Sequence, residues 1–323
     1  MIFIISIYGV FVNILLSNDD GYKSLGLKVL RSALGNFGNV LTVAPHKDIS
    51  ASSSCLSVHR PVKTVMISKK FYKVYGTPAD CVHIGSKGIL KKYPDIGMIN
   101  VDIANVYANV KGMLDTLQIY RKEFPHITIS AGNIATPKLI EKLYNAGADY
   151  IKVGVGSGAA CRTRSEVGVG VPQLSAIMDC HTEAEKFGLK IISDGGCVKS
   201  GDVCKAIAAG ADLVMIAGMV SHCEECDNIV EIDGKKFVNL YGLGSTKMYN
   251  QTKPTEQEYR PNEGRDLLIP CKGSIRSVLK QIQGGLRSVC TYTGAEHINQ
   301  LKKTSMFVRV NNTINRSLEK YEK

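Results

Sequence analysis

A glycine-rich loop in the middle of the chain carries the residues best suited to covalent chemistry. The segment VGVGSGAACRTRSEVGVGVPQ places Cys161, Thr163 and Arg164 directly after an apolar stretch. Small neighbours let a thiol approach a planar ring, Arg164 and backbone N–H groups favour the thiolate, and the Thr163 hydroxyl can assist proton transfer. A buried, inert cysteine in a tight turn explains the local sequence equally well.

Two adjacent carboxylates near the start of the chain form a second candidate site. Asp19 and Asp20 follow the apolar run NILL and have a hydroxyl side chain nearby. Hard divalent cations prefer such oxygen ligands and can support phosphate hydrolysis. The alternative is a polar loop at a strand end that binds no metal.

The elements that must position these residues alternate between strands and helices. NILLS, GLKVLRSALGNF and VLTVAP predict a strand, a helix and a strand, followed by a hairpin that turns at Lys69-Lys70 and by a helix in TPADCVHIGSKGIL. From Gly97 onward, GMINVDIAN, TISAGNIAT, YIKVGVGSG, KIISDGG and LVMIAGM predict five strands separated by helices. This rhythm is typical of an α/β fold with parallel strands, whose carboxyl ends present ligand-binding loops.

The alternation stops after LVMIAGM. Residues from His222 to about Gly273 are polar and irregular, which predicts a long functional flap. Within this flap the motif HCEEC places His222 beside Cys223 and Cys226. No second ligand pair completes a zinc site, so we expect a loop without metal. The stretch SIRSVLKQIQGGLRSVC predicts a final helix.

Composition narrows the class of protein. The chain has 323 residues, 10 cysteines and a formal net charge of +11. Lysine and arginine are scattered and not interleaved with aromatic residues, so we expect no nucleic-acid partner. Cysteines spread through a long chain fit reduced thiols in the cytoplasm. The apolar opening MIFIISIYGVFVNILL is short for a membrane span, so we expect a buried strand and no membrane partner.

Six ordered motifs between about residue 97 and about residue 310 resemble the IMP dehydrogenase and GMP reductase family. They are the cysteine loop, ISDGGC, LVMIAGM, LYGLGS, EYRPNEG and IQGGLRSVCTYTGA. EYRPNEG and GGLRSVCTYTGA favour the GMP reductase branch. The resemblance implies a (β/α) TIM-type barrel, of which only the C-terminal five strands are matched, and a homo-oligomer that is a tetramer in this family.

The resemblance also implies an activity, the NADPH-dependent conversion of GMP to IMP and ammonia through a covalent bond to Cys161. Cys161, Thr163 and Glu263 match the nucleophile and the proton-handling residues. The matching substrate-binding positions are Asp194, Gly195, Gly196, Gly218, Gly242, Leu243, Gly244, Arg260 and Gly264. The matching cofactor-binding positions are Asp102, Ile103, Ala104, Tyr259, Arg260, Ser288, Val289, Cys290 and Thr291. Gly156, Gly158 and Cys161 match backbone positions that ligate a monovalent cation, K⁺, in this family.

Residues from about 13 to 96 resemble a different family, the SurE survival-protein nucleotidases. The motifs are LLSNDDGYKSLGLKVL, VAPHKDISASSS and YGTPADCVHIG. This resemblance makes Asp19, Asp20 and Ser50 ligands of Mg²⁺ or Mn²⁺, but the asparagine expected beyond Ile96 lacks its usual surroundings. We therefore expect a partial Rossmann-like SurE α/β unit at 1–96 and a partial barrel at 97–323, with its flap at about 222–273.

Four functions are compatible with these motifs, and we expect the first of them. They are a GMP reductase reaction, an IMP dehydrogenase-type reaction, a metal-dependent 5′-nucleotidase in the N-terminal part, and a nucleotide-binding fusion remnant without catalysis. Five barrel strands leave two open edges and an uncovered apolar interior. Either the N-terminal unit covers this opening or another chain must do so.

Overall fold

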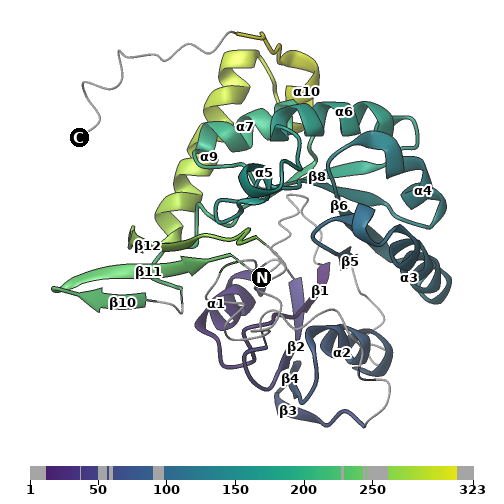
Figure 1. Ribbon diagram of the computed structural model, residues 1–323, viewed down its shortest axis with the longest axis vertical. Coiled ribbons are helices and arrows are strands. Elements are labelled where there is room, and N and C mark those ends of the chain that lie inside the picture. Colours follow the sequence, from purple (N-terminus) through teal and green to yellow (C-terminus); the bar gives the residue numbers. More distant parts are fainter. Residues whose placement is uncertain are drawn as a thin grey trace.

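The computed structural model describes residues 12–36, 38–49, 57, 61–89, 98–226, 229–242, 245 and 261–310. This part of the chain forms an α/β unit with a mixed sheet, an α/β unit with a parallel sheet, and a small antiparallel sheet (Figure 1). The predicted α/β class is therefore confirmed. Within the described residues, no helix is both long enough and apolar enough to cross a membrane.

The N-terminal unit is a four-stranded sheet with the order β1-β2-β4-β3. Its strands are β1 (Val12–Leu16), β2 (Gly38–Pro45), β3 (Thr64–Ser68) and β4 (Phe71–Val74), and its helices are α1 (Leu25–Leu34), α2 (Pro78–His83) and the π-helical turn η1 (Ile84–Ile89). The Ser24 hydroxyl caps α1 by accepting the Leu27 N–H at 3.2 Å. Lys70 adopts a φ of 60° at the turn between β3 and β4, where the hairpin was predicted.

The second unit is a curled sheet of five parallel strands in chain order. These strands are β5 (Met98–Asp102), β6 (Thr128–Ile134), β7 (Tyr150–Val153), β8 (Lys190–Asp194) and β9 (Leu213–Met215). The helical segments between them are η3 (Val106–Ala108), α3 (Val110–Glu123), η4 (Pro137–Leu139), α4 (Ile140–Asn145), α5 (Thr163–Glu166), α6 (Gln173–Glu185) and α7 (Ser200–Ala208). All five predicted strands are present, and in the described chain β5 and β9 are open edges of a half-barrel.

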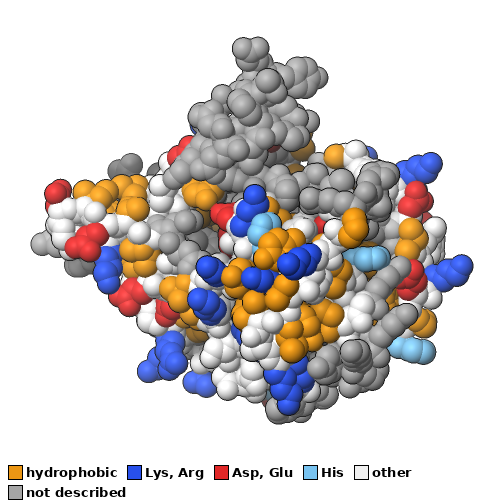
Figure 2. All heavy atoms as spheres, turned by 90° about the horizontal axis from the view of Figure 1, so that it is seen from below, with side chains coloured by type: hydrophobic (Ala, Val, Ile, Leu, Met, Phe, Trp, Pro, Cys, Tyr) orange, Lys and Arg blue, Asp and Glu red, His pale blue; other side chains and the backbone are white. Residues whose placement is uncertain are grey.

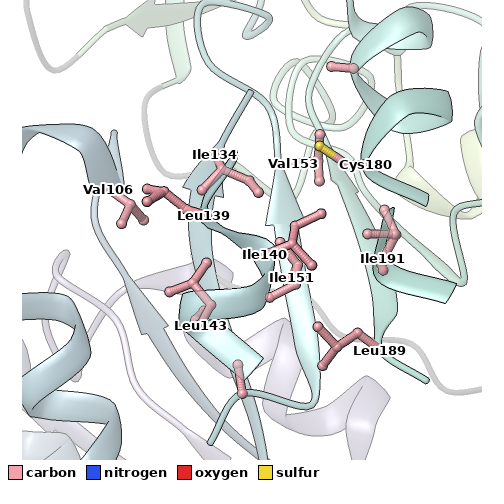
Figure 3. Packing of buried hydrophobic residues seen from close by; sticks show 14 of the residues in the cluster. Val106, Ile134, Leu139, Ile140, Leu143, Ile151, Val153, Cys180, Leu189 and Ile191 are labelled. Atoms are coloured by element: carbon pink, nitrogen blue, oxygen red, sulfur yellow. The ribbon is translucent and has the colours of Figure 1, made fainter. Parts of the chain in front are cut away.

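The core of this half-barrel lies between the sheet and its helices. Leu139, Ile140 and Leu143 pack against Ile134 and Ile151 of the sheet (Figure 3). These side chains are at most 6% exposed, so their apolar burial helps to hold the helices in place.

Two aspartates tie neighbouring strands together in the same way. The backbone of Asp149 donates to Ile129 O at 2.7 Å, and its carboxylate accepts the Ile129 N–H, also at 2.7 Å. Asp212 repeats this double contact with Ile191, at 2.8 and 2.9 Å. Both aspartates come from the same short sequence, Gly-Ala-Asp, at the start of a strand. The repeat therefore sets the register of β6 with β7 and of β8 with β9.

The flap contains more regular structure than the sequence predicted. β10 (Ile229–Ile232), β11 (Lys235–Tyr241) and β12 (Asp266–Pro270) form an antiparallel sheet. Asp233 and Gly234 adopt φ values of 50° and 70°, as a tight two-residue hairpin requires. The sequence interpretation predicted an irregular segment here. It overlooked the Asp-Gly pair, which lies between two stretches of alternating polar and apolar residues and is a strong hairpin signal. The chain then forms α9 (Ile275–Thr293), the predicted final helix, followed by η6 (Ile298–Gln300) and α10 (Leu301–Thr304).

One hydrophobic cluster joins the two α/β units. Leu41, Val43, Val74 and Cys81 from the N-terminal unit are buried together with Ile99 of β5. The side chains packed around them come from both units and include Leu15, Tyr72, Val101, Tyr120, Phe124 and Ile127. The N-terminal unit therefore covers apolar surface at the β5 edge of the half-barrel.

The outer side of the N-terminal unit is basic and aromatic. Seen from below, hydrophobic side chains gather among lysine and arginine side chains (Figure 2). The β3–β4 hairpin, lowest in Figure 1, exposes Met66 and Ile67. Lys63 and Lys73 lie over the Tyr75 ring, each 5.6 Å from its centroid, and partly shield it from water.

The shared cluster predicts that the two units unfold together. Leu41→Ala removes a side chain from the cluster and should lower the free energy of unfolding by about 2–5 kcal/mol. It should also increase amide hydrogen exchange in α3, which belongs to the other unit. Leu30→Ala is a second variant for comparison, because Leu30 is equally buried but packs inside the N-terminal unit alone, and it should raise exchange in α3 as well if the two units unfold as one. Unchanged protection of α3 in Leu41→Ala would contradict the coupling.

Candidate active site

The cysteine loop lies against the ends of the neighbouring strands. After β7 the chain turns through residues 154–162, and the Ser157 hydroxyl donates to Asp194 O at 2.8 Å, at the end of β8. Gly195, which follows directly, has a φ of 83°, and a Cβ there would come within 2.7 Å of Ser157 Oγ. The glycine therefore permits the loop to dock on β8, and Ser157 supplies the hydrogen bond.

A hydrogen-bond chain links the cysteine to a carboxylate. Cys161 Sγ donates to Thr163 Oγ1 at 3.2 Å, and Thr163 Oγ1 donates to Glu263 Oε2 at 2.6 Å. The three side chains are half-buried. Thr163 and Glu263 are 100 positions apart in the sequence. This arrangement can carry a proton from the thiol to the carboxylate.

Backbone contacts hold the two ends of this chain together. The Arg162 N–H donates to Glu263 O at 2.6 Å, and the Arg265 N–H donates to Ala160 O at 2.9 Å. Gly242 follows β11 and packs so closely that a Cβ there would meet Ala160 O at 2.7 Å. The segment that carries Glu263 is thus fixed against the cysteine loop by the flap sheet, and not by side chains alone.

The structure brings together most of the predicted substrate-binding positions. Asp194, Gly195 and Gly196 follow β8 beside Ser157, Gly218 follows β9 against Ala159, and Gly242 and Gly264 adjoin Ala160 and Cys161. Leu243, Gly244 and Arg260 lie outside the described residues. The segments around the cysteine loop therefore carry little side-chain bulk.

A buried lysine is a residue of this site that the sequence interpretation missed. Lys152 of β7 is 2% exposed, forms an ion pair with Asp102, and lies 3.1 Å from Asp194 Oδ2. Asn133 donates to the same Asp194 oxygen at 2.8 Å and to Gly154 O at 2.8 Å. Two carboxylates compensate the buried ammonium. The lysine within the apolar strand YIKV was the signal that could have revealed it.

The predicted cofactor positions fall into two groups that one chain does not bring together. The first group lies at one edge of the half-barrel, where Asp102 ends β5 and Ile103 and Ala104 follow it. Ser288–Thr291 lie in α9, which packs on α7 near the opposite edge (Figure 1). Tyr259 and Arg260 lie outside the described residues. A mainly apolar pocket of about 260 Å³ adjoins the first group and is lined in part by Asn105, Tyr107 and Val169.

The structure describes the three positions predicted to bind K⁺, but not all three positions predicted to bind a divalent metal. Gly156 has a φ of 73°, and Gly158 O accepts the Cys161 N–H at 3.0 Å, which leaves that oxygen one further lone pair. In the N-terminal unit, Asp19 and Asp20 follow β1, whereas Ser50 lies outside the described residues. Among the residues that the structure describes, no three His, Cys, Asp or Glu side chains are grouped to hold a metal.

Most other cysteines behave as packing residues. Burial and the neighbouring Asp179 raise the pKa of Cys180 to about 12. Burial also raises the pKa of Cys197 to about 11 and that of Cys81 to about 12. A thiol whose pKa is raised this far is a poor nucleophile at neutral pH. Cys161 differs from them because it sits in a half-open loop with a hydroxyl partner.

Comparisons with known proteins show the family of the chain. The profile described as "IMP dehydrogenase / GMP reductase domain" matches residues 87–318, and the profile "Survival protein SurE" matches residues 14–105. A GMP reductase from Phytophthora infestans is 42% identical over 228 residues, which cover 70% of this chain and 62% of that protein. Human GMP reductase 2 is also 42% identical over 228 residues, covering 70% and 65%. The match with GMP reductase from Shewanella pealeana is 44% identical over 223 residues, covering 69% and 64%.

A solved structure gives the same result. A Trypanosoma brucei GMP reductase in complex with guanosine 5′-monophosphate superposes with a TM-score of 0.62 and 26% identity, over 85% of this chain and 63% of that chain. The chain thus spans less than two thirds of the length of these relatives. Its profile match nevertheless covers well over half of its residues. The protein belongs to the IMP dehydrogenase / GMP reductase family, with a SurE-like segment at its N-terminus.

Proposed function

We propose that the protein is a GMP reductase, which converts GMP and NADPH to IMP, ammonium and NADP⁺. The hydrogen-bond chain from Cys161 through Thr163 to Glu263 is the observation that carries this proposal. The named relatives are GMP reductases, and neither an IMP dehydrogenase nor a nucleotidase reaction is favoured by them. The free thiols of the described chain suit a reducing compartment such as the cytoplasm.

The chain's own residues can perform the first half of the reaction. Thr163 relays the Cys161 proton to Glu263, and the thiolate adds to C2 of the purine. The proton held at Glu263 can return through Thr163 to the 2-amino group, which leaves as ammonia while the sulfur stays bound to C2. Gly195, Gly218 and Gly242 pack directly against the cysteine loop, so that backbone and no side chains lie beside this thiol, where ribose and phosphate would bind.

Two groups of residues would hold the cofactor. When bound, NADPH supplies the hydride that C2 accepts before the Cys161 sulfur departs. The end of β5 fits this role, because Asp102 is held by Lys152 beside the apolar pocket. The carbonyls of Gly156, Gly158 and Cys161 would hold K⁺ and thereby stiffen the loop of the nucleophile. No step of the proposal uses a divalent metal at Asp19, Asp20 or Ser50.

Cys161→Ala tests the nucleophile. The variant should lose GMP-dependent NADPH oxidation completely, because the alanine side chain cannot form the bond to C2. It should still be stabilised thermally by GMP, since the backbone around the loop stays intact. NADPH oxidation that persists in Cys161→Ala, or equal turnover of IMP with NAD⁺ by the unaltered protein, would contradict the assignment.

Thr163→Val and Glu263→Gln test the proton relay. Each removes one member without changing the shape of the site, and each should lower kcat by about 10²–10⁴-fold with little change in the KM for GMP. Ser165→Ala and Glu166→Gln are matched controls in the same helical turn, because their side chains bond only to the local loop. A proportional loss in the controls would show that the loop, and not the relay, was damaged.

A second copy of the chain would complete the cofactor site. The carboxyl end of β5 and residues 288–291 of α9 lie near opposite edges of the sheet. In a homo-oligomer, the end of β5 from one chain would meet residues 288–291 from a neighbouring chain. Ser288 and Thr291 are exposed, as such an interface requires. A tetramer, the assembly implied by the resemblance, is one arrangement that satisfies this.

Coexpression of two inactive variants tests the shared site. Asp102→Ala and Thr291→Trp should each abolish turnover alone, because each damages one half of every cofactor site. Coexpressed chains should regain activity, since a mixed assembly contains sites in which both halves are intact. Mixed assemblies that form, as shown by copurification of differently tagged chains, but stay inactive would place the whole cofactor site in one chain.

A further inference from the structure

The β3–β4 hairpin of the N-terminal unit exposes apolar side chains at the edge of its sheet. β3 is the outermost strand in the order β1-β2-β4-β3. Within β3, Met66 is 62% exposed and Ile67 is 43% exposed, and neither belongs to the shared cluster. The hairpin lies lowest in Figure 1, away from the cysteine loop. The proposed reaction therefore does not explain these two side chains.

The surroundings of this hairpin are basic. Residues 21–79 contain nine lysine or arginine residues and a single acidic residue, Asp48. Lys63 and Lys69 are exposed on either side of β3 along the chain. Figure 2 shows hydrophobic side chains on this lower face ringed by lysine and arginine side chains, with most acidic side chains toward its sides. The unit thus presents a positively charged face with an apolar centre.

Hydrogen bonds fix the turn of the hairpin against the rest of the unit. The Arg31 guanidinium donates to Lys69 O at 3.1 Å and to Lys70 O at 3.0 Å. The Thr42 N–H donates to Lys70 O at 2.8 Å, and the Lys70 ammonium donates to Asn39 Oδ1 at 3.0 Å. The turn is therefore ordered before any partner binds, which lowers the entropic cost of docking.

The first strand enters the sheet at the same edge as this turn. β1 begins at Val12, which pairs with Gly38, and the next residue of β2, Asn39, is the one that contacts Lys70. The residues before β1, MIFIISIYGVF, have no charged side chain and lie outside the described part of the chain. An uncharged, mainly apolar sequence thus joins the unit at the edge that carries the basic turn.

The aromatic rings of this face are not free to stack on nucleic-acid bases. His46 stacks on Tyr75 with the ring centroids 4.5 Å apart, and the Lys63 ammonium lies 5.6 Å from the Tyr75 centroid. The Lys73 ammonium lies over both Tyr22 and Tyr75, at 5.2 and 5.6 Å from their centroids. Base stacking supplies much of the binding of single-stranded nucleic acid, so the face favours a different anionic partner.

We propose that the β3–β4 hairpin binds the surface of a bilayer that contains anionic phospholipids. Met66 and Ile67 enter the boundary between headgroups and acyl chains, while the ammonium groups of Lys63, Lys69 and Lys73 contact the phosphate groups. The sequence interpretation excluded a membrane partner because the apolar opening is short for a span. Binding of a folded hairpin to the surface needs no span, and it does not depend on the proposed function.

Vesicle sedimentation of the full chain tests the membrane contact. The protein should sediment with vesicles of phosphatidylcholine mixed with phosphatidylserine but not with vesicles of phosphatidylcholine alone. Binding should weaken as the salt concentration rises, because salt screens the lysines from the headgroups. Equal binding to both vesicles would show that charge plays no part and would overturn the proposal. So would binding to a single-stranded oligonucleotide without binding to either vesicle.

Two pairs of substitutions locate the contact. Met66→Ser combined with Ile67→Ser removes the apolar centre, and Lys63→Gln combined with Lys69→Gln removes two of the surrounding charges. Each pair should weaken binding to the phosphatidylserine vesicles by about tenfold. Both pairs change exposed side chains, so the melting temperature should not change.

The β10–β11 hairpin provides the matched control. It exposes Val230 and Ile232, at 38% and 43%, but its charges balance. These charges are on Glu231, Asp233, Lys235 and Lys236. Val230→Ser combined with Ile232→Ser should therefore leave vesicle binding unchanged.

The comparison of the two hairpins decides the assignment. If the Met66 and Ile67 pair binds vesicles as tightly as the unaltered protein, the contact lies elsewhere, for example in the residues before β1, and the proposal is refuted. An equal loss in the Val230 and Ile232 pair would also refute it, because any exposed apolar hairpin would then suffice. Neither result depends on turnover of GMP.

Discussion

The apolar side of an open parallel sheet must be buried, and the rest of this structure depends on which segments cover it. A closed barrel buries its own interior and has no edges, but β5 and β9 of this sheet each have a single strand neighbour in the described chain. At β5 the N-terminal unit supplies the missing cover through Leu41, Val43 and Val74. Without this cover, the helix α3 and the strand that ends in Asp102 would both face water on an apolar side.

The chain combines segments of two families without an obvious linker. The SurE profile ends at residue 105 and the IMP dehydrogenase / GMP reductase profile begins at residue 87, so the two overlap in sequence. The superposition on a GMP reductase covers 85% of the chain, and it therefore extends into the N-terminal unit. Part of the SurE-like segment is thus included in the superposition, although its sequence resembles a different family.

The candidate active site is built from loops that different parts of the fold hold in place. The glycine-rich segments after β7, β8 and β9 surround the cysteine loop, and the flap holds Glu263 next to it. Lys152 forms ion pairs with both Asp102 and Asp194. The strands and the flap have different tasks here. The strands position the cysteine loop, while the flap positions Glu263 against Thr163.

The sequence by itself determined the two families, the five strands of the half-barrel and the order of the loops, because apolar periodicity and glycine-rich motifs are local. It also singled out Cys161 and Thr163 in the glycine-rich loop, whereas Glu263 was identified only through resemblance. The hydrogen bonds among them, across 100 positions, required the tertiary structure. The sheet of the flap was missed because its Asp233-Gly234 turn lies in a polar stretch, where hydrophobic periodicity is weak.

Only the tertiary structure decided which groups meet. Lys152 could be recognised as buried only when the strand neighbours that carry Asp102 and Asp194 were in place. In the same way, one chain keeps Asp102 and the residues 288–291 of α9 near opposite edges, which no motif order reveals. Pairing between strands and burial of side chains are non-local. They depend on distances between residues that are far apart in the sequence, and the order of residues along the chain does not contain these distances.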